Sequence, residues 1–309
     1  MISPAHPHLV VLNKDEHTVM YVDLAERRVV KTTPVDTNPH EIAILPDGSR
    51  SYVTNSGGNT ISVLDNASGD EIKRIISPEF KFPHGVAVTN DGRRLWMAST
   101  YANKVFIIDT ATDEIVRTIP TLQEHVHMVS LSPDGRRAYV PNIASNNITV
   151  FDVEAEAIIT HFPVGRGPEG VAVHPNGREL YVANQHDNDL WIIDTETYAV
   201  LARRRLGTLP VRMAFSPDGR YAFSPNRESS DLSIIDCNRR WEIKRIRVGV
   251  WPGGTVFDQD GKFAYVANNK TNDISIIDIA TLKQIGTIDA GIHPDGMAYL
   301  PTRTPIQPT

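Results

Sequence analysis

A short pattern that ends in aspartate recurs along the whole chain. Apolar residues lead into the aspartate at seven places, which are Asp23, Asp65, Asp109, Asp152, Asp194, Asp236 and Asp278. Successive aspartates are 42, 44, 43, 42, 42 and 42 residues apart. Repetition at this period is typical of folds in which every copy is one supersecondary unit. The repeat therefore constrains the fold more than any other feature of the sequence.

Each repeat reads as four short strands. In the unit that contains Asp194, apolar and β-branched runs cover residues 170–173, 179–183, 190–193 and 199–203. The turn Pro175-Asn176-Gly177 separates the first two runs, since Gly accepts the positive φ of a tight hairpin. The aspartate is expected to cap the turn between the third and fourth strands. A unit of this length with four strands is a β-propeller blade.

Seven aspartates predict an all-β fold, a seven-bladed β-propeller with four antiparallel strands per blade. The chain starts with the last three strands of a blade, at residues 9–12, 18–22 and 28–32. It ends with a lone first strand at 296–300. The last blade is therefore expected to combine both ends, which closes the ring and removes a free sheet edge. We expect one domain over residues 1–309, with a flexible tail at 302–309.

The second strand carries a recurring tetrapeptide. It reads Tyr52-Val53-Thr54-Asn55 and is echoed at 139–142, 181–184 and 265–268. With the downstream Ile-Ile-Asp-Thr runs, the sequence closely resembles the YVTN-family β-propellers over essentially its whole length. The resemblance implies the fold, while propellers host binding proteins, lactonases, lyases and oxidoreductases alike.

Composition excludes several classes of function. The 31 basic and 37 acidic residues give a net charge of −6, without the basic excess of a nucleic-acid binder. No apolar run approaches the length of a membrane span. Cys237 is the single cysteine, so there is no intramolecular disulfide framework. The first residues lack a secretion signal, and if Met1 is the native start we expect a cytoplasmic protein.

The first strand of each blade lines the channel, so its first residues are the informative positions. A Pro-x-Gly pattern aligns them, and the x residues are His40, His84, His127, Glu169, Val211, Gly253 and Asp295. Equivalent positions in a ring aim their side chains at one point near the channel mouth. Three histidines and a glutamate are thus expected to converge.

These donors suit a transition metal. We predict that His40, His84 and His127 bind one ion of Zn, Mn, Fe, Ni or Cu, with Glu169 as fourth ligand or general base. Such a site is similar to the histidine-ligated metal of propeller lyases that act on uronates. Val126 replaces the proline in the third blade, so His125 is an alternative third ligand or a support for one. The other interpretation is that the histidines bond the channel wall or an anion without metal.

Further candidates surround this ring. Asp295 is a candidate general base, and Arg212 a candidate for binding a substrate carboxylate. The loops between the second and third strands form the rim. Candidate substrate contacts at or near this rim are Tyr101, His186, Arg227 and Trp251.

The resulting hypothesis is a metal-dependent lyase or hydrolase acting on a small anionic or oxygenated molecule at the channel mouth. A metal-dependent oxygenase at the same site is one alternative. A metal-free lactonase or cycloisomerase that uses His84, Glu169 and Arg212 is another. The last is a non-catalytic binding scaffold.

Overall fold

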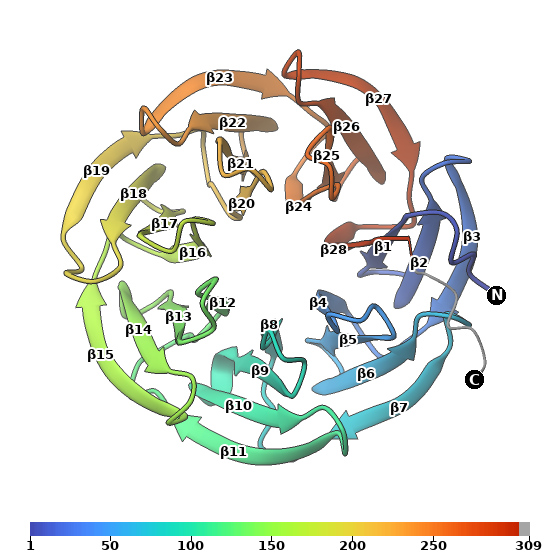
Figure 1. The fold of residues 1–309 in the computed structure, drawn as a ribbon, viewed down its shortest axis with the longest axis horizontal. Coiled ribbons are helices and arrows are strands. Elements are labelled where there is room, and N and C mark those ends of the chain that lie inside the picture. The colour runs from blue at the N-terminus through green and yellow to red at the C-terminus, as the bar shows by residue number, and fades with distance from the viewer. Residues whose placement is uncertain (303–309) are drawn as a thin grey trace.

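Seven antiparallel sheets surround a central channel. The computed structural model describes residues 1–302, and each sheet has four strands (Figure 1). Blades 1 to 6 are the sheets β4–β7, β8–β11, β12–β15, β16–β19, β20–β23 and β24–β27. Blade 7 has the order β28-β1-β2-β3, so the last strand and the first three close the ring as predicted. Apart from Thr302, the predicted flexible tail lies outside the described residues.

The strands occupy four concentric positions. The inner strands are β4 (Pro39–Ile44), β8 (Pro83–Val88), β12 (Ser130–Leu131), β16 (Pro168–Val173), β20 (Ala214–Phe215), β24 (Pro252–Phe257) and β28 (Pro294–Leu300). The second strands are β1 (His8–Asn13), β5 (Arg50–Asn55), β9 (Arg94–Ser99), β13 (Arg137–Asn142), β17 (Glu179–Asn184), β21 (Tyr221–Asn226) and β25 (Phe263–Asn268).

The outer half of each blade is equally regular. The third strands are β2 (Thr18–Asp23), β6 (Thr60–Asp65), β10 (Lys104–Asp109), β14 (Asn147–Asp152), β18 (Asp189–Asp194), β22 (Asp231–Asp236) and β26 (Asp273–Asp278). The fourth strands are β3 (Arg28–Pro34), β7 (Glu71–Ile76), β11 (Glu114–Pro120), β15 (Ala157–Pro163), β19 (Val200–Arg205), β23 (Trp241–Arg247) and β27 (Lys283–Asp289). A short 3-10 helix, η1 (Thr100–Ala102), follows β9.

The inner strand is short in blades 3 and 5, where β12 and β20 have two residues each. In these two blades a proline, Pro141 or Pro225, occupies the next-to-last position of the second strand. The Pro141 carbonyl still accepts a bond from the His127 N–H at 3.0 Å, so this residue faces the inner strand. Proline has no N–H to return a bond, and the ladder is interrupted there.

The recurring Asp residues cap the outer turns as expected, and the recurring Asn residues at the ends of the second strands fix the loops that follow. Asp194 Oδ1 accepts bonds from the backbone N–H groups of Glu196 and Thr197, at 3.0 and 2.8 Å. The Asn55 amide donates to Thr60 and Ser62 across the next loop, at 3.1 and 2.9 Å. Side chains therefore fix both the outer turns and the loops at the channel mouth.

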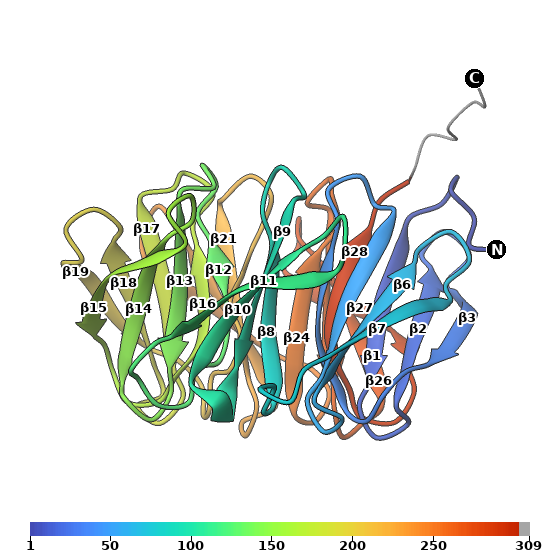
Figure 2. The same ribbon diagram turned by 90° about the horizontal axis from the view of Figure 1, so that it is seen from below.

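Apolar residues pack between the blades. Among residues 1–302 there are seven hydrophobic clusters, and each joins two neighbouring sheets. Because every blade is covered on both faces, the blades stand side by side around the channel (Figures 1 and 2). In residues 1–302 no helix has the length and apolarity needed to cross a membrane.

Around the channel, glycine lets the inner strands of neighbouring blades approach closely. The Gly85 N–H donates to the His127 carbonyl at 2.8 Å. A Cβ at Gly85 would overlap the backbone of His127 and Met128. The position therefore requires glycine, because backbone rather than a flexible side chain fills the space.

We expect Gly85→Ala to destabilise the protein by about 1–3 kcal/mol or more, because the added methyl forces two inner strands apart. Gly286→Ala in β27 is the matched control, since a Cβ there meets nothing within 4 Å. It should be neutral or stabilising by about 0.4–1 kcal/mol. Urea unfolding of both variants measures the difference, and equal stabilities would contradict the close approach.

Candidate functional site

The ring of equivalent positions is present as aligned from the sequence. The residue before each position pairs with the last residue of the second strand: Pro39 with Asn55, Pro83 with Ser99, Val126 with Asn142, Pro168 with Asn184, Pro210 with Asn226, Pro252 with Asn268 and Pro294 with Asn13. His127, and not His125, therefore occupies the position equivalent to His40 and His84. His125 is exposed and lies edge-on to Tyr101, at 5.4 Å between ring centroids.

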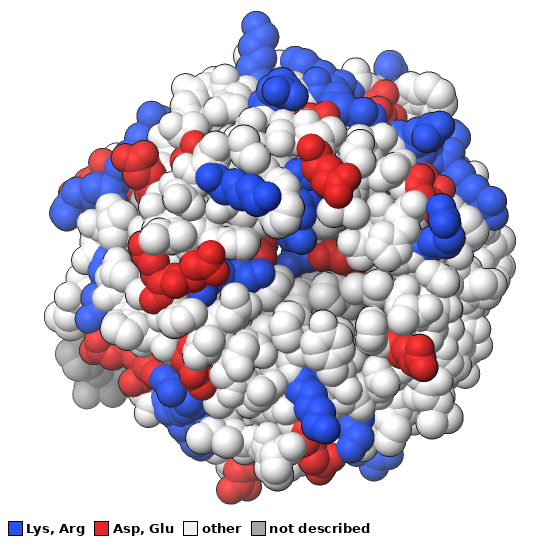
Figure 3. Space-filling view, turned by 180° about the vertical axis from the view of Figure 1, so that it is seen from behind, with Lys and Arg blue, Asp and Glu red and all other residues white. Residues whose placement is uncertain are grey.

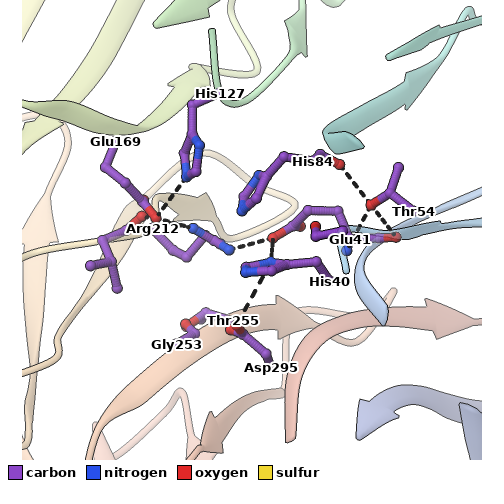
Figure 4. Close-up of polar contacts among 12 residues, drawn as sticks. His40, Glu41, Thr54, His84, His127, Glu169, Arg212, Gly253, Thr255 and Asp295 are labelled. Carbon is purple, nitrogen blue, oxygen red and sulfur yellow. Dashed lines mark hydrogen bonds and ion pairs between the residues drawn. The ribbon is translucent and has the colours of Figure 1, made fainter. Parts of the chain in front are cut away.

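The three histidines form a buried stack at the channel mouth. The ring centroids of His40 and His84 are 4.0 Å apart, and those of His84 and His127 are 3.6 Å apart. Consecutive blades bring these rings together (Figure 4). The expected convergence of three imidazoles is therefore seen in the structure.

An ion-pair network crosses the channel beside the stack. The Arg212 guanidinium pairs with Glu169 of blade 4 on one side and with Glu41 of blade 1 on the other (Figure 4). Glu169 Oε1 also lies 3.4 Å from Nε2 of His127. Arg212 thus holds two carboxylates, while its predicted contact with a substrate carboxylate stays a prediction.

Lys14 completes the far end of the site. Its ammonium lies 2.8 Å from Nε2 of His40 and donates to Asp295 at 3.2 Å. Nδ1 of His40 then faces two carboxylates, with Glu41 Oε1 at 3.6 Å and Asp295 Oδ2 at 3.8 Å. Asp295, predicted as a general base, is fully buried beside this cation.

The sequence interpretation missed Glu41 as a site residue. His40 and Glu41 are adjacent, and alternation along a strand would send them to opposite faces. The register of β4 against β5 shifts between Pro39 and Glu41, which marks a β-bulge. A bulge re-aims side chains, so both residues reach the channel. The sequence signal for Glu41 is its position: it is a charged residue directly after the x residue of the Pro-x-Gly pattern, where most blades have glycine.

Burial dominates the protonation of the histidines. It holds the pKa of His40 well below the usual range, with Lys14 acting in the same direction and Asp295 opposing. Burial also holds the pKa of His84 well below its usual range, aided by His127 and His40. For His127 burial lowers the pKa and Glu169 opposes. The three imidazoles are therefore neutral near pH 7.

The pKa values of the three carboxyl groups differ because their neighbours differ. Burial raises the pKa of Glu41 to about 7, with Arg212 opposing and Asp295 adding to the rise. Burial would also raise the pKa of Glu169, but Arg212 and His127 hold it below its ordinary value. For Asp295, Lys14 and His40 outweigh burial and hold the pKa well below its ordinary value. Glu169 and Asp295 are thus ionised near pH 7.

A pocket of about 250 Å³ opens over the stack. It is lined by His40, Phe82, His84, Thr100, Tyr101, His125, His127, Ile143, Glu169, Gln185 and Arg227. Figure 3 shows this face of the molecule, where acidic and basic side chains are visible in a central hollow. Of the predicted rim contacts, Tyr101 and Arg227 line the pocket. His186 and Trp251 lie outside this lining, and Trp251 packs against the Lys270 ammonium.

The residues that can share one metal ion differ from those predicted. Ligand atoms of His40, Glu41 and His84 lie within 4.8 Å of one another. Within residues 1–302, His127 and Glu169 do not join this group, because each faces the other and Glu169 also faces Arg212. A second group, His6, Asp23 and Glu26, lies at the outer turn of blade 7.

Comparison with known families gives one match. The family described as "Lactonase, 7-bladed beta-propeller" matches residues 117–289, which is more than half of the 309-residue chain. No curated protein matches the sequence.

Solved structures with the same fold are numerous. A structure titled Kuenenia stuttgartiensis hydrazine synthase is 24% identical, with a TM-score of 0.82 over 91% of this chain and 95% of that one. The periplasmic gluconolactonase PpgL of Pseudomonas aeruginosa is 20% identical, with a TM-score of 0.76 over 96% and 99%. A putative 6-phosphogluconolactonase of Bacteroides fragilis is 15% identical, with a TM-score of 0.79 over 96% and 98%. At these identities the likeness is one of fold.

We expect Arg212→Met to destabilise the protein by about 3–5 kcal/mol, because it leaves two buried carboxylates without their cation. Arg245→Met is the matched control. Arg245 pairs with Glu242 on the outer strand β23, where such a pair contributes about 0–1 kcal/mol. Urea unfolding at pH 7 measures both variants, and similar losses would contradict a central role for the channel ion pairs.

Proposed function

Because the chain belongs to the seven-bladed β-propeller lactonase family, we propose that it hydrolyses a lactone, the cyclic ester of a small oxygen-rich acid, with side chains alone. Two structural neighbours named as lactonases support the proposal. This proposal is the metal-free lactonase alternative of the sequence analysis, and it replaces the metal-dependent lyase or hydrolase as the main hypothesis. Hydrolase chemistry agrees with these comparisons, whereas they lend nothing to a lyase. We also propose, from the tetrapeptides of the second strands, that the chain is a YVTN-repeat propeller.

The pairing of His127 with Glu169 carries the proposal. Nε2 of His127 lies 3.4 Å from the Glu169 carboxylate, which favours the tautomer with its proton on Nε2. Nδ1 is then the basic nitrogen, and it accepts a long hydrogen bond of 3.4 Å from the Thr100 hydroxyl at the pocket wall, a contact that a reacting water would replace. Arg212 fixes Glu169 from the other side. A carboxylate-oriented neutral imidazole is a suitable general base for water.

The proposed reaction uses these groups in two steps. His127 Nδ1 removes a proton from a water molecule as the water oxygen attacks the lactone carbonyl carbon. The ring C–O bond of the resulting tetrahedral intermediate breaks, and the leaving oxygen takes the proton back from Nδ1. Glu169 stabilises the imidazolium that exists between the two steps. One water is consumed, and the product is the open-chain hydroxy acid.

The pocket favours a small substrate with one flat side and one polar side. Its volume of about 250 Å³ lies below the roughly 300–1,000 Å³ of sites for drug-sized ligands. Phe82 and Tyr101, 5.1 Å apart between centroids, supply an apolar wall. Nε of Arg227 is buried without a hydrogen-bond partner in the described residues, and the guanidinium lies 5.9 Å from the centre of the Trp251 ring, so we assign this side chain to the substrate oxygens.

The test is hydrolysis of glucono-δ-lactone and 6-phosphogluconolactone, with the spontaneous rate subtracted. We expect His127→Gln to lower kcat by roughly 10²–10⁴-fold, the usual contribution of a general base. His174→Gln is the control, because His174 bonds to the Gly219 carbonyl away from the pocket. EDTA should leave the wild-type rate unchanged.

Two outcomes would contradict the proposal. One is the absence of hydrolysis above the spontaneous rate for a panel of five- and six-membered lactones. The other is a His127→Gln variant that is as active as the wild type. Loss of activity in EDTA that added metal restores would favour the metal-dependent hypothesis instead.

A further inference from the structure

Backbone N–H groups around the pocket are already bonded at four places. In blades 2 to 5, the residue after the second strand donates its N–H to the carbonyl of the residue that precedes the inner strand. The pairs are Thr100 with Phe82, Ile143 with His125, Gln185 with Gly167 and Arg227 with Leu209, at 2.9–3.0 Å. Enzymes that cleave esters often bind the oxygen of the tetrahedral intermediate through such N–H groups. Because these four are occupied, side chains are the better placed donors.

Arg227 is the one Arg or Lys among the residues that line the pocket within the described part of the chain. It lies in the rim loop that follows β21. Its Nε is buried without a hydrogen-bond partner in residues 1–302, and its guanidinium lies 5.9 Å from the centre of the Trp251 ring. Arg212, by contrast, is bonded to two carboxylates. Arg227 is therefore the cationic donor that a bound substrate can use.

The charge of Arg227 reaches the two residues that carry the proposed hydrolysis. Burial lowers the pKa of His127, and Arg227 acts in the same direction. Burial would raise the pKa of Glu169, whereas neighbouring groups that include Arg212 and Arg227 lower it. All three residues, Arg227, His127 and Glu169, line the same pocket. A substrate that contacts His127 is therefore within electrostatic reach of the guanidinium.

We propose that the Arg227 guanidinium binds the carbonyl oxygen of the lactone and stabilises the negative charge that develops on this oxygen during hydrolysis. The inference rests on the proposed function and gives it a second catalytic residue. As the water oxygen bonds to the carbonyl carbon, the π electron pair of the C=O bond moves onto the oxygen, and His127 takes the water proton. When the ring C–O bond breaks, this pair re-forms the carbonyl, and the leaving oxygen takes the proton from His127.

The two charges of the intermediate then meet opposite charges that are already in place. Glu169 faces the imidazolium of His127, at 3.4 Å from its Nε2, and Arg227 faces the oxyanion. Groups fixed in advance in this way stabilise a transition state without reorganising at the moment of reaction.

This role also narrows the class of substrate. Arg227 is engaged by the reacting carbonyl, so it does not serve an acidic substituent elsewhere on the molecule. The lining contains one further ionised group, the carboxylate of Glu169, and this group repels anions. The favoured substrate is therefore a lactone whose substituents are uncharged, such as hydroxyl groups.

The test compares Arg227→Met with the wild type on glucono-δ-lactone, with the spontaneous rate subtracted. We expect kcat to fall by roughly 10²–10³-fold, the usual loss when one oxyanion donor is removed, with KM little changed. Guanidinium chloride at a low, non-denaturing concentration should restore part of the rate, because the free cation can enter the space that the side chain has left. Arg227→Lys keeps the charge without the planar fork, so its kcat should lie between the two.

Arg166→Met is the matched control. Arg166 lies on the same rim but pairs with Asp187 at 2.7 Å and does not line the pocket. This variant should keep the wild-type kcat and should not respond to guanidinium. Thermal unfolding checks that the variants are folded.

Two outcomes would overturn the role of Arg227 and leave the hydrolysis proposal standing. One is an Arg227→Met variant that keeps kcat while His127→Gln loses it. The other is a higher KM at unchanged kcat, which would make Arg227 a binding group only. A wild-type kcat/KM for 6-phosphogluconolactone above that for glucono-δ-lactone would overturn the substrate class. A wild type that hydrolyses no lactone would overturn the hydrolysis proposal, and the role of Arg227 with it.

Discussion

The close approach of the inner strands around the channel positions everything else in this molecule. Gly85 bonds through its backbone N–H to the carbonyl of His127, and a side chain at that glycine would separate the two strands. A Cβ at Gly296 would likewise overlap the carbonyl of His40. Because the backbones touch, the histidines of consecutive blades stack directly on one another. A wider channel would leave them apart and hydrated.

The polar side chains buried at the channel mouth have lost contact with water, so other groups of the protein must stabilise their charges. Burial disfavours charge, and it dominates the pKa of every histidine in the stack. Burial raises the pKa of Glu41 to about 7 despite its pairing with Arg212, whereas neighbouring cations keep the other two carboxylates of the site ionised. Against the effect of burial, Arg212 keeps Glu169 ionised, and Lys14 does so for Asp295. Arg212 thus lies between the His127–Glu169 pair on one side and Glu41, beside His40, on the other.

Much of the fold was predictable because the repeat acts locally. Each Asp that ends a third strand caps its own turn, and each Asn that ends a second strand bonds within its own loop. Such contacts span only a few residues, so their spacing can be read along the chain. The inner strands of blades 3 and 5 are shortened opposite Pro141 and Pro225, and these two prolines are visible in the sequence.

The sequence by itself determined the seven blades, the closure of blade 7 and the ring position that places His40, His84 and His127 at one mouth. The tertiary structure decided which side chains pair there. Glu41 and Arg212 are 171 residues apart, and no local pattern relates them. A β-bulge brings Glu41 into the channel against the normal alternation of the strand. Partners across a closed ring are set by the sum of all blade rotations, which becomes fixed only when the seventh blade closes.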